Sequence, residues 1–215
     1  MIPIERKIAR QHPQLTGLPH FAMRRIAPIL TLAACLISVT AGADQDPATG
    51  KLLVATDEVR GEIFARTVIL LLDYDQEGAM GLVVNRPTEV EPAEILTDPE
   101  AMSNYNGTLY WGGPVQMSSL RALLRSDTPP GGAVTIVGHV HLVPFDDELA
   151  NSPMDPTSLR LFIGYAGWAP GQLDRELALG SWHVIPATEE LVFADDPAAI
   201  WDRLKPVEKY RVAVD

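Results

Sequence analysis

An uninterrupted apolar run, Val68-Ile69-Leu70-Leu71-Leu72, constrains the fold more than any other feature of the sequence. A strand with one face in solvent alternates apolar and polar residues. A run without alternation is instead typical of a central strand that is covered on both faces. We therefore expect a sheet in which this segment is an interior strand.

Apolar runs of strand length recur along the chain and are bounded by Gly, Pro, Asn and Asp, which favour turns. Because they do not alternate strictly with helices, they predict an α+β domain. The chain shows no internal repeat that would indicate a solenoid. The expected strands cover residues 52–55, 67–72, 81–85, 108–111, 120–124, 134–137, 159–165, 181–185 and 190–193.

Helical signals are fewer. Residues 172–179 carry Leu173 and Leu177 on one face and are followed by Gly180, which is suited to end a helix. Asp196-Pro197 is typical of a helix start and precedes an apolar face over 198–204. Two further helices, with weaker signals, are expected over 92–102 and 145–151.

Charge is distributed unevenly along the chain. Residues 1–43 carry a net +4 and the whole chain carries −11, so residues 44–215 carry −15. An acidic domain without a basic stripe repels phosphate backbones, and we expect no direct binding of nucleic acid. The single cysteine, Cys35, lies outside the acidic part, which therefore offers no disulfide, thiolate metal site or cysteine nucleophile.

Residues 23–43 have the three parts of a cleavable export signal. Two arginines precede an apolar stretch, and Ala41-Gly42-Ala43 supplies the small residues of a cleavage site. The stretch is short for a membrane-spanning helix, which needs about 20 residues. We expect cleavage after Ala43, a single domain over 44–215, a periplasmic or otherwise exported location, and no membrane attachment after cleavage.

Two alternatives stay open in this segment. The start is Met1 or Met23, since residues 1–22 lack any pattern. Leu32-Ala33-Ala34-Cys35 is similar to a lipobox, and acylation at Cys35 would give an anchored lipoprotein instead.

Two glycine-containing stretches carry candidate ligand contacts. Asn85-Arg86-Pro87 ends an expected strand, and Arg86 either binds an anion in a cleft or pairs with a carboxylate of the same domain. Gly112-Gly113 follows an expected strand, and its backbone amides either bind an anion or only form a turn.

The densest motif, over 164–177, combines a strand, a glycine-rich turn and a helix. Amides at the helix start can hold an anion, and Gln172 and Glu176 share one helical face. Trp168 either stacks on a ligand or fills the core. We expect a small anion where this turn meets the strand end at Arg86. The expected ligand-binding residues are Asn85, Arg86, Gly112, Gly113, Gly167, Trp168, Gly171, Gln172 and Glu176.

Metal and catalytic signals are sparse. His139 and His141 can share one face of a strand and are the candidate metal ligands. A third ligand would have to come from elsewhere, such as His183, Asp146 or Asp147, so we expect neither a metal nor a cofactor. No Gly-x-Ser-x-Gly nucleophile elbow occurs, and no convergent acid/base set can be assembled. We assign no catalytic residue.

Together these motifs resemble those of the YqgE/AlgH family. The likeness rests on Gly-Ala-Met-Gly-Leu-Val-Val-Asn-Arg-Pro at 78–87, Gly-Gly-Pro-Val at 112–115 and Gly-Tyr-Ala-Gly-Trp at 164–168. Gly171-Gln172-Leu173 and Glu176-Leu177 follow the third motif. Trp182 and Trp201 also stand where that family places tryptophan, and the likeness covers about residues 50–205.

The resemblance implies an α+β fold whose mixed, bifurcated sheet closes into a pseudo-barrel with a few short flanking helices. It implies a cytoplasmic location, because members usually lack a signal peptide, and it implies no reaction. One branch is linked by name to regulation of alginate synthesis. Members often carry Cys or His where this chain has Asp73-Tyr74-Asp75, and Leu-His where it has Leu124-Arg125.

For function, we expect a non-enzymatic binding or regulatory module that contacts a small anion or a protein partner. The alternative is an enzyme of unknown reaction that uses the small-anion cleft.

Overall fold

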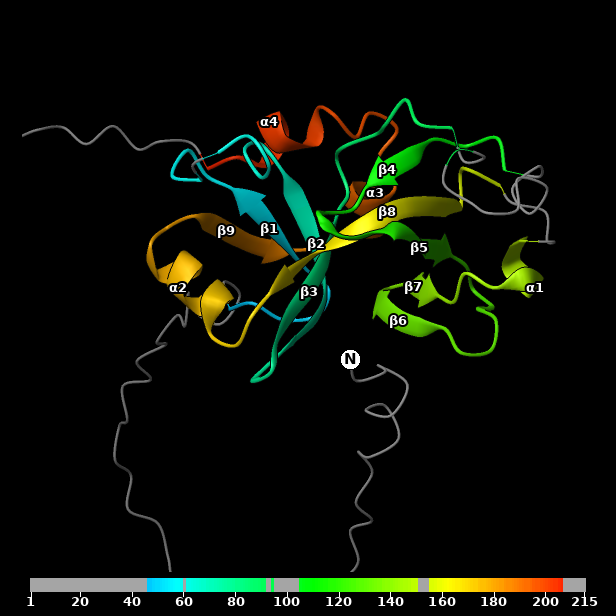
Figure 1. Cartoon of the computed structure of the whole chain (residues 1–215), viewed down its shortest axis with the longest axis horizontal. Coiled ribbons are helices and arrows are strands. Elements are labelled where there is room, and N and C mark those ends of the chain that lie inside the picture. The colour runs from blue at the N-terminus through cyan, green and yellow to red at the C-terminus, as the bar shows by residue number, and fades with distance from the viewer. Residues whose placement is uncertain (1–45, 60, 92–93, 95–104, 151–154, 207–215) are drawn as a thin grey trace, which may run out of the picture. The chain divides into compact units, whose positions relative to one another are not determined.

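The computed structural model describes residues 46–59, 61–91, 94, 105–150 and 155–206 (Figure 1). These residues all belong to one unit, Thr40–Asp215. The predicted export signal, Cys35 and the cleavage site after Ala43 lie outside the described residues, as does nearly all of the helix expected over 92–102. Across the described ranges, no helix combines the length and apolar character needed to cross a membrane.

The described residues form a nine-stranded sheet in the order β6-β7-β5-β8-β3-β2-β1-β9, with β4 paired to β8. Every pairing is antiparallel except that of β4 with β8, which is parallel. The strands are β1 (Lys51–Ala55), β2 (Val68–Asp75), β3 (Gly78–Val83), β4 (Leu109–Trp111), β5 (Val115–Arg125), β6 (Val134–Val137), β7 (Val140–Val143), β8 (Leu159–Trp168) and β9 (Trp182–Pro186).

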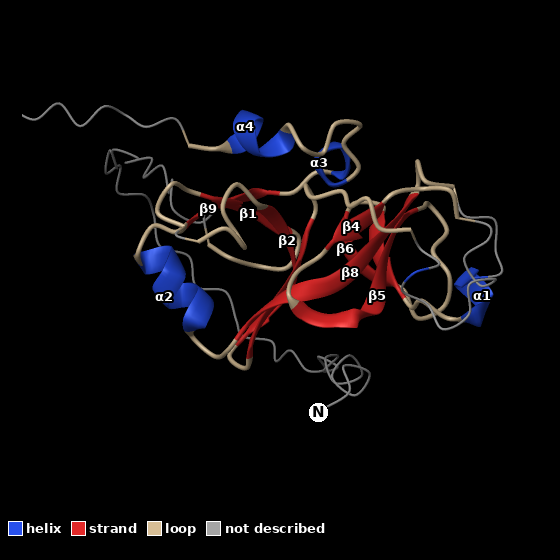
Figure 2. Ribbon diagram, turned by 45° about the horizontal axis from the view of Figure 1, so that its top comes forward, coloured by secondary structure: helices blue, strands red, loops and turns tan. Residues whose placement is uncertain are grey.

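The sheet forks along β8. Residues 161–163 of β8 pair with β4, whereas residues 166–168 pair with β3. β5 pairs with residues 159–165 along one edge of β8, and β4 and β3 share the other edge of β8. The sheet curls strongly into a half-barrel (Figure 2). This arrangement confirms the predicted α+β fold with a mixed, bifurcated sheet of pseudo-barrel type.

The segment that constrained the sequence most lies where it was expected. β2 pairs with β1 on one side and β3 on the other. Residues 68–71 of β2 are fully buried, and Leu72 is 6% exposed. The strand continues beyond the apolar run to Asp75, where it forms a hairpin with Gly78 of β3.

The helices are short: α1 (Asp147–Ala150), α2 (Gln172–Ala178), α3 (Glu189–Val192) and α4 (Ile200–Leu204). α2 and α4 confirm the two stronger helical signals. The strand expected over 190–193 is wrong, because α3 covers residues 190–192 and Phe193 is its C-cap. Thr188 caps this helix by accepting a hydrogen bond from the Leu191 amide, and this local start signal outweighs the strand preference of the apolar residues that follow.

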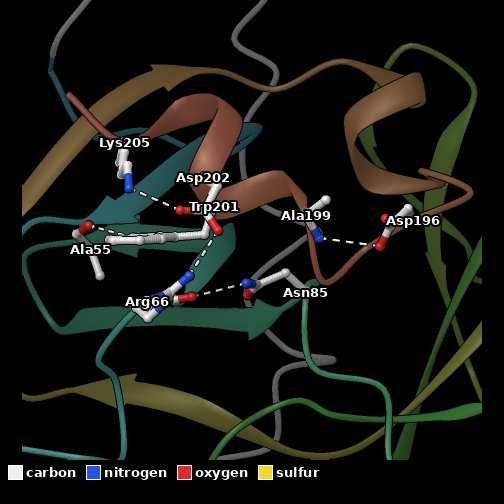
Figure 3. A network of polar contacts seen from close by, with 8 residues as sticks. All are labelled: Ala55, Arg66, Asn85, Asp196, Ala199, Trp201, Asp202 and Lys205. Carbon is white, nitrogen blue, oxygen red and sulfur yellow. Dashed lines mark hydrogen bonds and ion pairs between the residues drawn. The ribbon is translucent and has the colours of Figure 1, made fainter. Parts of the chain in front are cut away.

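α4 is fixed to β1 through Trp201. The indole Nε1 donates to the Ala55 carbonyl at 2.7 Å. Arg66 and Lys205 lie over the indole ring, at 4.5 Å and 4.7 Å from its centre, and both bind Asp202 (Figure 3). This contact also anchors the end of the turn over 61–66, which includes Arg66.

Candidate functional site

The carboxylate of Glu176, on α2, is held by three neutral donors. Nε1 of Trp168 and Nε1 of Trp182 donate to Oε2 at 2.9 Å and 2.8 Å, and Nε2 of Gln172 donates to Oε1 at 2.9 Å. Within the described ranges, Glu176 forms no ion pair. Its charge is therefore balanced by the dipoles of N–H groups on β8, α2 and β9, and by no cationic side chain of the described residues.

Local sequence explains how the donors reach Glu176. Gly171 takes a left-handed conformation, with φ of 66°, and allows the chain to turn from β8 into α2. Gln172 and Glu176 are one helical turn apart, as predicted. The Gln172 side chain is fixed at both ends, because its Oε1 accepts from the Ala169 amide at 3.1 Å. That amide, at the start of the helix, is therefore already occupied.

A hollow of about 430 Å³ opens beside Glu176. One wall is formed by residues 58–59 and 61–64, and the other includes Ser181 and Trp182. The Phe64 ring meets the Trp182 ring at 6.2 Å in an edge-on arrangement. The described lining residues are Glu58, Val59, Gly61, Glu62, Ile63, Phe64, Glu176, Ser181 and Trp182, so the described charges on the hollow are all acidic.

Arg86 holds the turn that forms the first wall. Its guanidinium donates to the carbonyls of Ile63, Glu62 and Ala65, at 3.2 Å for Glu62 and 2.8 Å for Ala65. It also lies over the Trp111 ring, 5.1 Å from the centre. Burial lowers the pKa of Arg86. The arginine thus binds backbone carbonyls in place of the carboxylate that we considered from the sequence.

Asn85 holds the end of the same turn. Its Nδ2 donates to the Arg66 carbonyl at 2.9 Å (Figure 3). Its Oδ1 accepts from the Val68 amide at 2.8 Å. Arg66 has φ of 58°, a conformation that residues other than glycine rarely adopt. Asn85 and Arg86 therefore position a wall of the hollow without lining it.

The expected glycines have a separate role at the fork of the sheet. The Gly112 amide donates to the Ile163 carbonyl and its carbonyl accepts from the Val83 amide, so it joins β8 to β3. A Cβ on Gly112 would approach the Gly164 carbonyl oxygen to 2.4 Å, and one on Gly113 would approach Tyr165 to 2.2 Å. Gly167 pairs with Met80 within the sheet. The structure thus places Gly112 and Gly113 where close backbone packing requires glycine.

Asp174 is paired away from the hollow. It accepts a hydrogen bond from the Tyr74 hydroxyl at 2.5 Å, and this bond is the main reason that the pKa of Tyr74 is raised. The contact ties α2 to the β2–β3 hairpin. Tyr74 lies in the stretch where the chain departs from the YqgE/AlgH pattern.

The two candidate metal ligands have different neighbours. Nδ1 of His139 lies 3.0 Å from a Glu189 oxygen. His141 is buried, with Thr135 Oγ1 at 3.0 Å and the Ser126 carbonyl at 2.9 Å from its two ring nitrogens. In the part of the chain that the structure describes, no group of three or more His, Cys, Asp or Glu side chains could hold a metal ion.

Of the nine expected site residues, Trp168, Gln172 and Glu176 form the hydrogen-bonded cluster. Sequence reasoning missed Phe64 and Trp182 as site residues. Trp182 had a signal, because it stands where the family places tryptophan. Phe64 had no sequence signal of a binding role, except that it is an aromatic residue on a turn.

Comparison with known proteins agrees with this fold. A family model described as AlgH-like matches residues 52–206. A UPF0301 protein of Streptomyces coelicolor is 40% identical over 164 residues, which cover 71% of this chain and 82% of that protein. A UPF0301 protein of Chlorobium limicola is 33% identical over 158 residues, covering 72% and 83%.

Two solved structures are also similar. The crystal structure of protein DIP2367 from Corynebacterium diphtheriae has a TM-score of 0.63 and 27% identity, covering 76% of this chain and 90% of that one. The solution structure of AlgH from Pseudomonas aeruginosa has a TM-score of 0.58 and 29% identity, covering 71% and 83%. The forked sheet, its three glycine-containing motifs and these matches lead to one conclusion: the chain belongs to the AlgH-like family.

Proposed function

We propose that this domain is a non-enzymatic binding module and that its binding site is the hollow beside Glu176. The observation that carries the proposal is that the motif at 78–87 and the stretch over 164–177 both shape this one hollow. Asn85 and Arg86 hold its first wall, and Trp111, which precedes the Gly-Gly turn, contacts Phe64 with ring centres 6.0 Å apart. The stretch over 164–177 supplies Glu176.

The chemistry of the hollow supports binding over catalysis. An acid/base mechanism needs groups that exchange protons with a substrate, and such groups usually have strongly shifted pKa values. Burial raises the pKa of Tyr105 to about 12, and Tyr105 does not line the hollow. Glu176 accepts hydrogen bonds from three fixed donors, an arrangement suited to a rigid recognition group.

The lining also bears on the kind of partner. Glu58, Glu62 and Glu176 repel an anion, and the Ala169 amide at the helix start is occupied by Gln172. These features favour a protein partner or a small molecule without negative charge over the small anion predicted from the sequence.

The test uses the indole N–H signals of the four tryptophans in the full-length, ¹⁵N-labelled chain. Each signal is assigned with single Trp→Phe variants. The chain is then titrated with defined amines, guanidines, carboxylates, phosphates and short peptides. We expect at least one compound to shift the Trp168 and Trp182 signals saturably, to leave Trp201 unmoved and to remain chemically unchanged. Conversion of a bound compound would establish an enzyme. If no compound moves the Trp182 signal, the proposal of a binding site at the hollow is wrong.

A further inference from the structure

Resting on the proposed binding function, we propose that the hollow takes an organic cation, a guanidinium or ammonium group. The group would lie against the rings of Phe64 and Trp182 and donate a hydrogen bond to the Glu176 carboxylate. The cation can be a free small molecule or a basic side chain of a protein partner, and the experiment separates these two sources.

Glu176 retains capacity to accept a hydrogen bond. A carboxylate offers about four acceptor positions. The two indoles use Oε2, and Gln172 contacts only Oε1, so one position on Oε1 remains beyond these three bonds. A ligand N–H⁺ donated to this position would form a charge-assisted hydrogen bond, which is about twice as strong as a neutral one.

Several aromatic rings outside the hollow already lie under a cation of the chain. Trp111 lies under Arg86, Trp201 lies under Arg66 and Lys205, and Tyr165 lies under Arg121. Among the described residues, the rings of Phe64, Trp168 and Trp182 have no such cation. Of these three, Phe64 and Trp182 line the hollow.

The hydrogen bonds to Glu176 also make the two indoles better partners for a cation. An indole that donates its N–H to a carboxylate gains electron density, and attraction of a cation to an aromatic ring grows with that density. Trp182 combines this donation with a place on the wall of the hollow. The ring and the carboxylate therefore attract the same kind of ligand.

Charge and size agree with a small organic cation. Glu58 and Glu62 add negative potential at the mouth, and residues 44–215 carry −15 in total. A concave site in such a domain concentrates cations. The volume of about 430 Å³ lies in the range of about 300–1,000 Å³ that is usual for ligand sites.

The experiment compares two ligands of the same shape. Acetyl-arginine methylamide and acetyl-citrulline methylamide differ in charge at the end of the side chain, and each is titrated into the full-length chain while the Trp182 indole signal is followed. We expect the arginine compound to bind about tenfold more tightly, as one charge-assisted hydrogen bond predicts. Inorganic phosphate should not compete. Equal binding of the two compounds would overturn the inference.

Variants locate the bound cation. Glu176→Gln should weaken binding of the arginine compound about tenfold. Glu62→Gln, on the exposed rim, should weaken it about twofold to threefold through charge alone. The matched control is Glu89→Gln, which removes one exposed carboxylate outside the lining and should leave binding unchanged. Equal effects of Glu62→Gln and Glu89→Gln, together with no effect of Glu176→Gln, would contradict the site.

Two further comparisons separate the outcomes. If butylguanidinium binds as tightly as an acetylated Gly-Arg-Gly amide, the ligand is a small molecule, and tighter binding of the peptide indicates a protein-borne side chain. If a neutral or anionic compound moves the Trp182 signal and the arginine compound does not, the cation inference fails while the binding site stands. If no compound moves that signal, both fail.

Discussion

Arg160 and Glu176 are both charged side chains held by neutral groups, and they lie in differently built regions. Arg160, on β8, is 7% exposed and donates to the Val192 and Ala194 carbonyls at 2.9 Å and 2.5 Å. Its guanidinium lies between the rings of Tyr110 and Phe193, at 4.8 Å and 5.4 Å. Every side of this cation is therefore close to groups of the chain itself, and burial lowers its pKa.

Glu176 is held as firmly on one side and is open on the other. Its three donors fix the carboxylate, and the hollow begins beyond it. The comparison teaches that a charge without an ion-pair partner is not by itself a sign of function. Arg160 is enclosed and ties β8 to the end of α3, whereas Glu176 faces space that a ligand can fill.

The largest expected effect concerns the enclosed charge. Arg160→Met leaves the carbonyls of Val192 and Ala194 without their donor in a buried place, which water reaches poorly. We expect a loss of about 3 kcal/mol in the free energy of unfolding, measured by urea denaturation. Arg121→Met is the control, since Arg121 also lies over a ring but is less buried, and it should cost under about 0.5 kcal/mol. Similar losses of unfolding free energy in the two variants would show that the enclosed position of Arg160 does not matter.

A smaller effect is expected for the open charge. Glu176→Leu removes the acceptor of two indoles and of Gln172, but water in the hollow can replace part of the lost contact. We expect a loss of about 2 kcal/mol in the same urea experiment. A loss equal to that of Arg160→Met would mean that Glu176 is as enclosed as Arg160, and would weaken the case for a site.

The Arg160 region also predicts a pH dependence. Burial raises the pKa of Tyr105 from 10.0 to about 12. Because the folded state holds this proton more tightly than the unfolded chain, the stabilisation is complete below about pH 10 and is lost as pH rises towards about 12. The free energy of unfolding should fall by up to about 1.4 kcal/mol per pH unit in this window. Tyr105→Phe should flatten the fall, and an unchanged slope would contradict the assignment.

Much of the fold could be predicted because its signals are local. The non-alternating run over 68–72 identified the central strand, and the spacing of Leu173 and Leu177 with Gly180 identified α2. The failure at 190–193 has a local cause too, since the cap at Thr188 competes with apolar residues that also suit a strand.

The site could be predicted only in part. Helical spacing was enough to pair Gln172 with Glu176. The contact of Phe64 with Trp182 joins segments far apart in sequence, and the pairing of β1 with both β2 and β9 brings them together. The partners of Arg86 were missed for a different reason. They are backbone carbonyls, which every residue has, so no side chain in the sequence marks them.

The smallest expected effect tests whether Arg86 serves the hollow or only the fold. Arg86→Met removes three hydrogen bonds to the turn over 61–66, but this turn is largely exposed and water can satisfy its carbonyls. We expect a loss of only about 1 kcal/mol in the free energy of unfolding. Because Phe64 is on that turn and contacts Trp182, the loosened wall should weaken binding of acetyl-arginine methylamide more than this stability loss would suggest. Hydrogen exchange of the Thr67 amide, which donates to the Phe64 carbonyl at 3.3 Å, should become faster. Arg121→Met should change neither property. Unchanged exchange at Thr67 with unchanged binding would show that the hollow keeps its shape without Arg86.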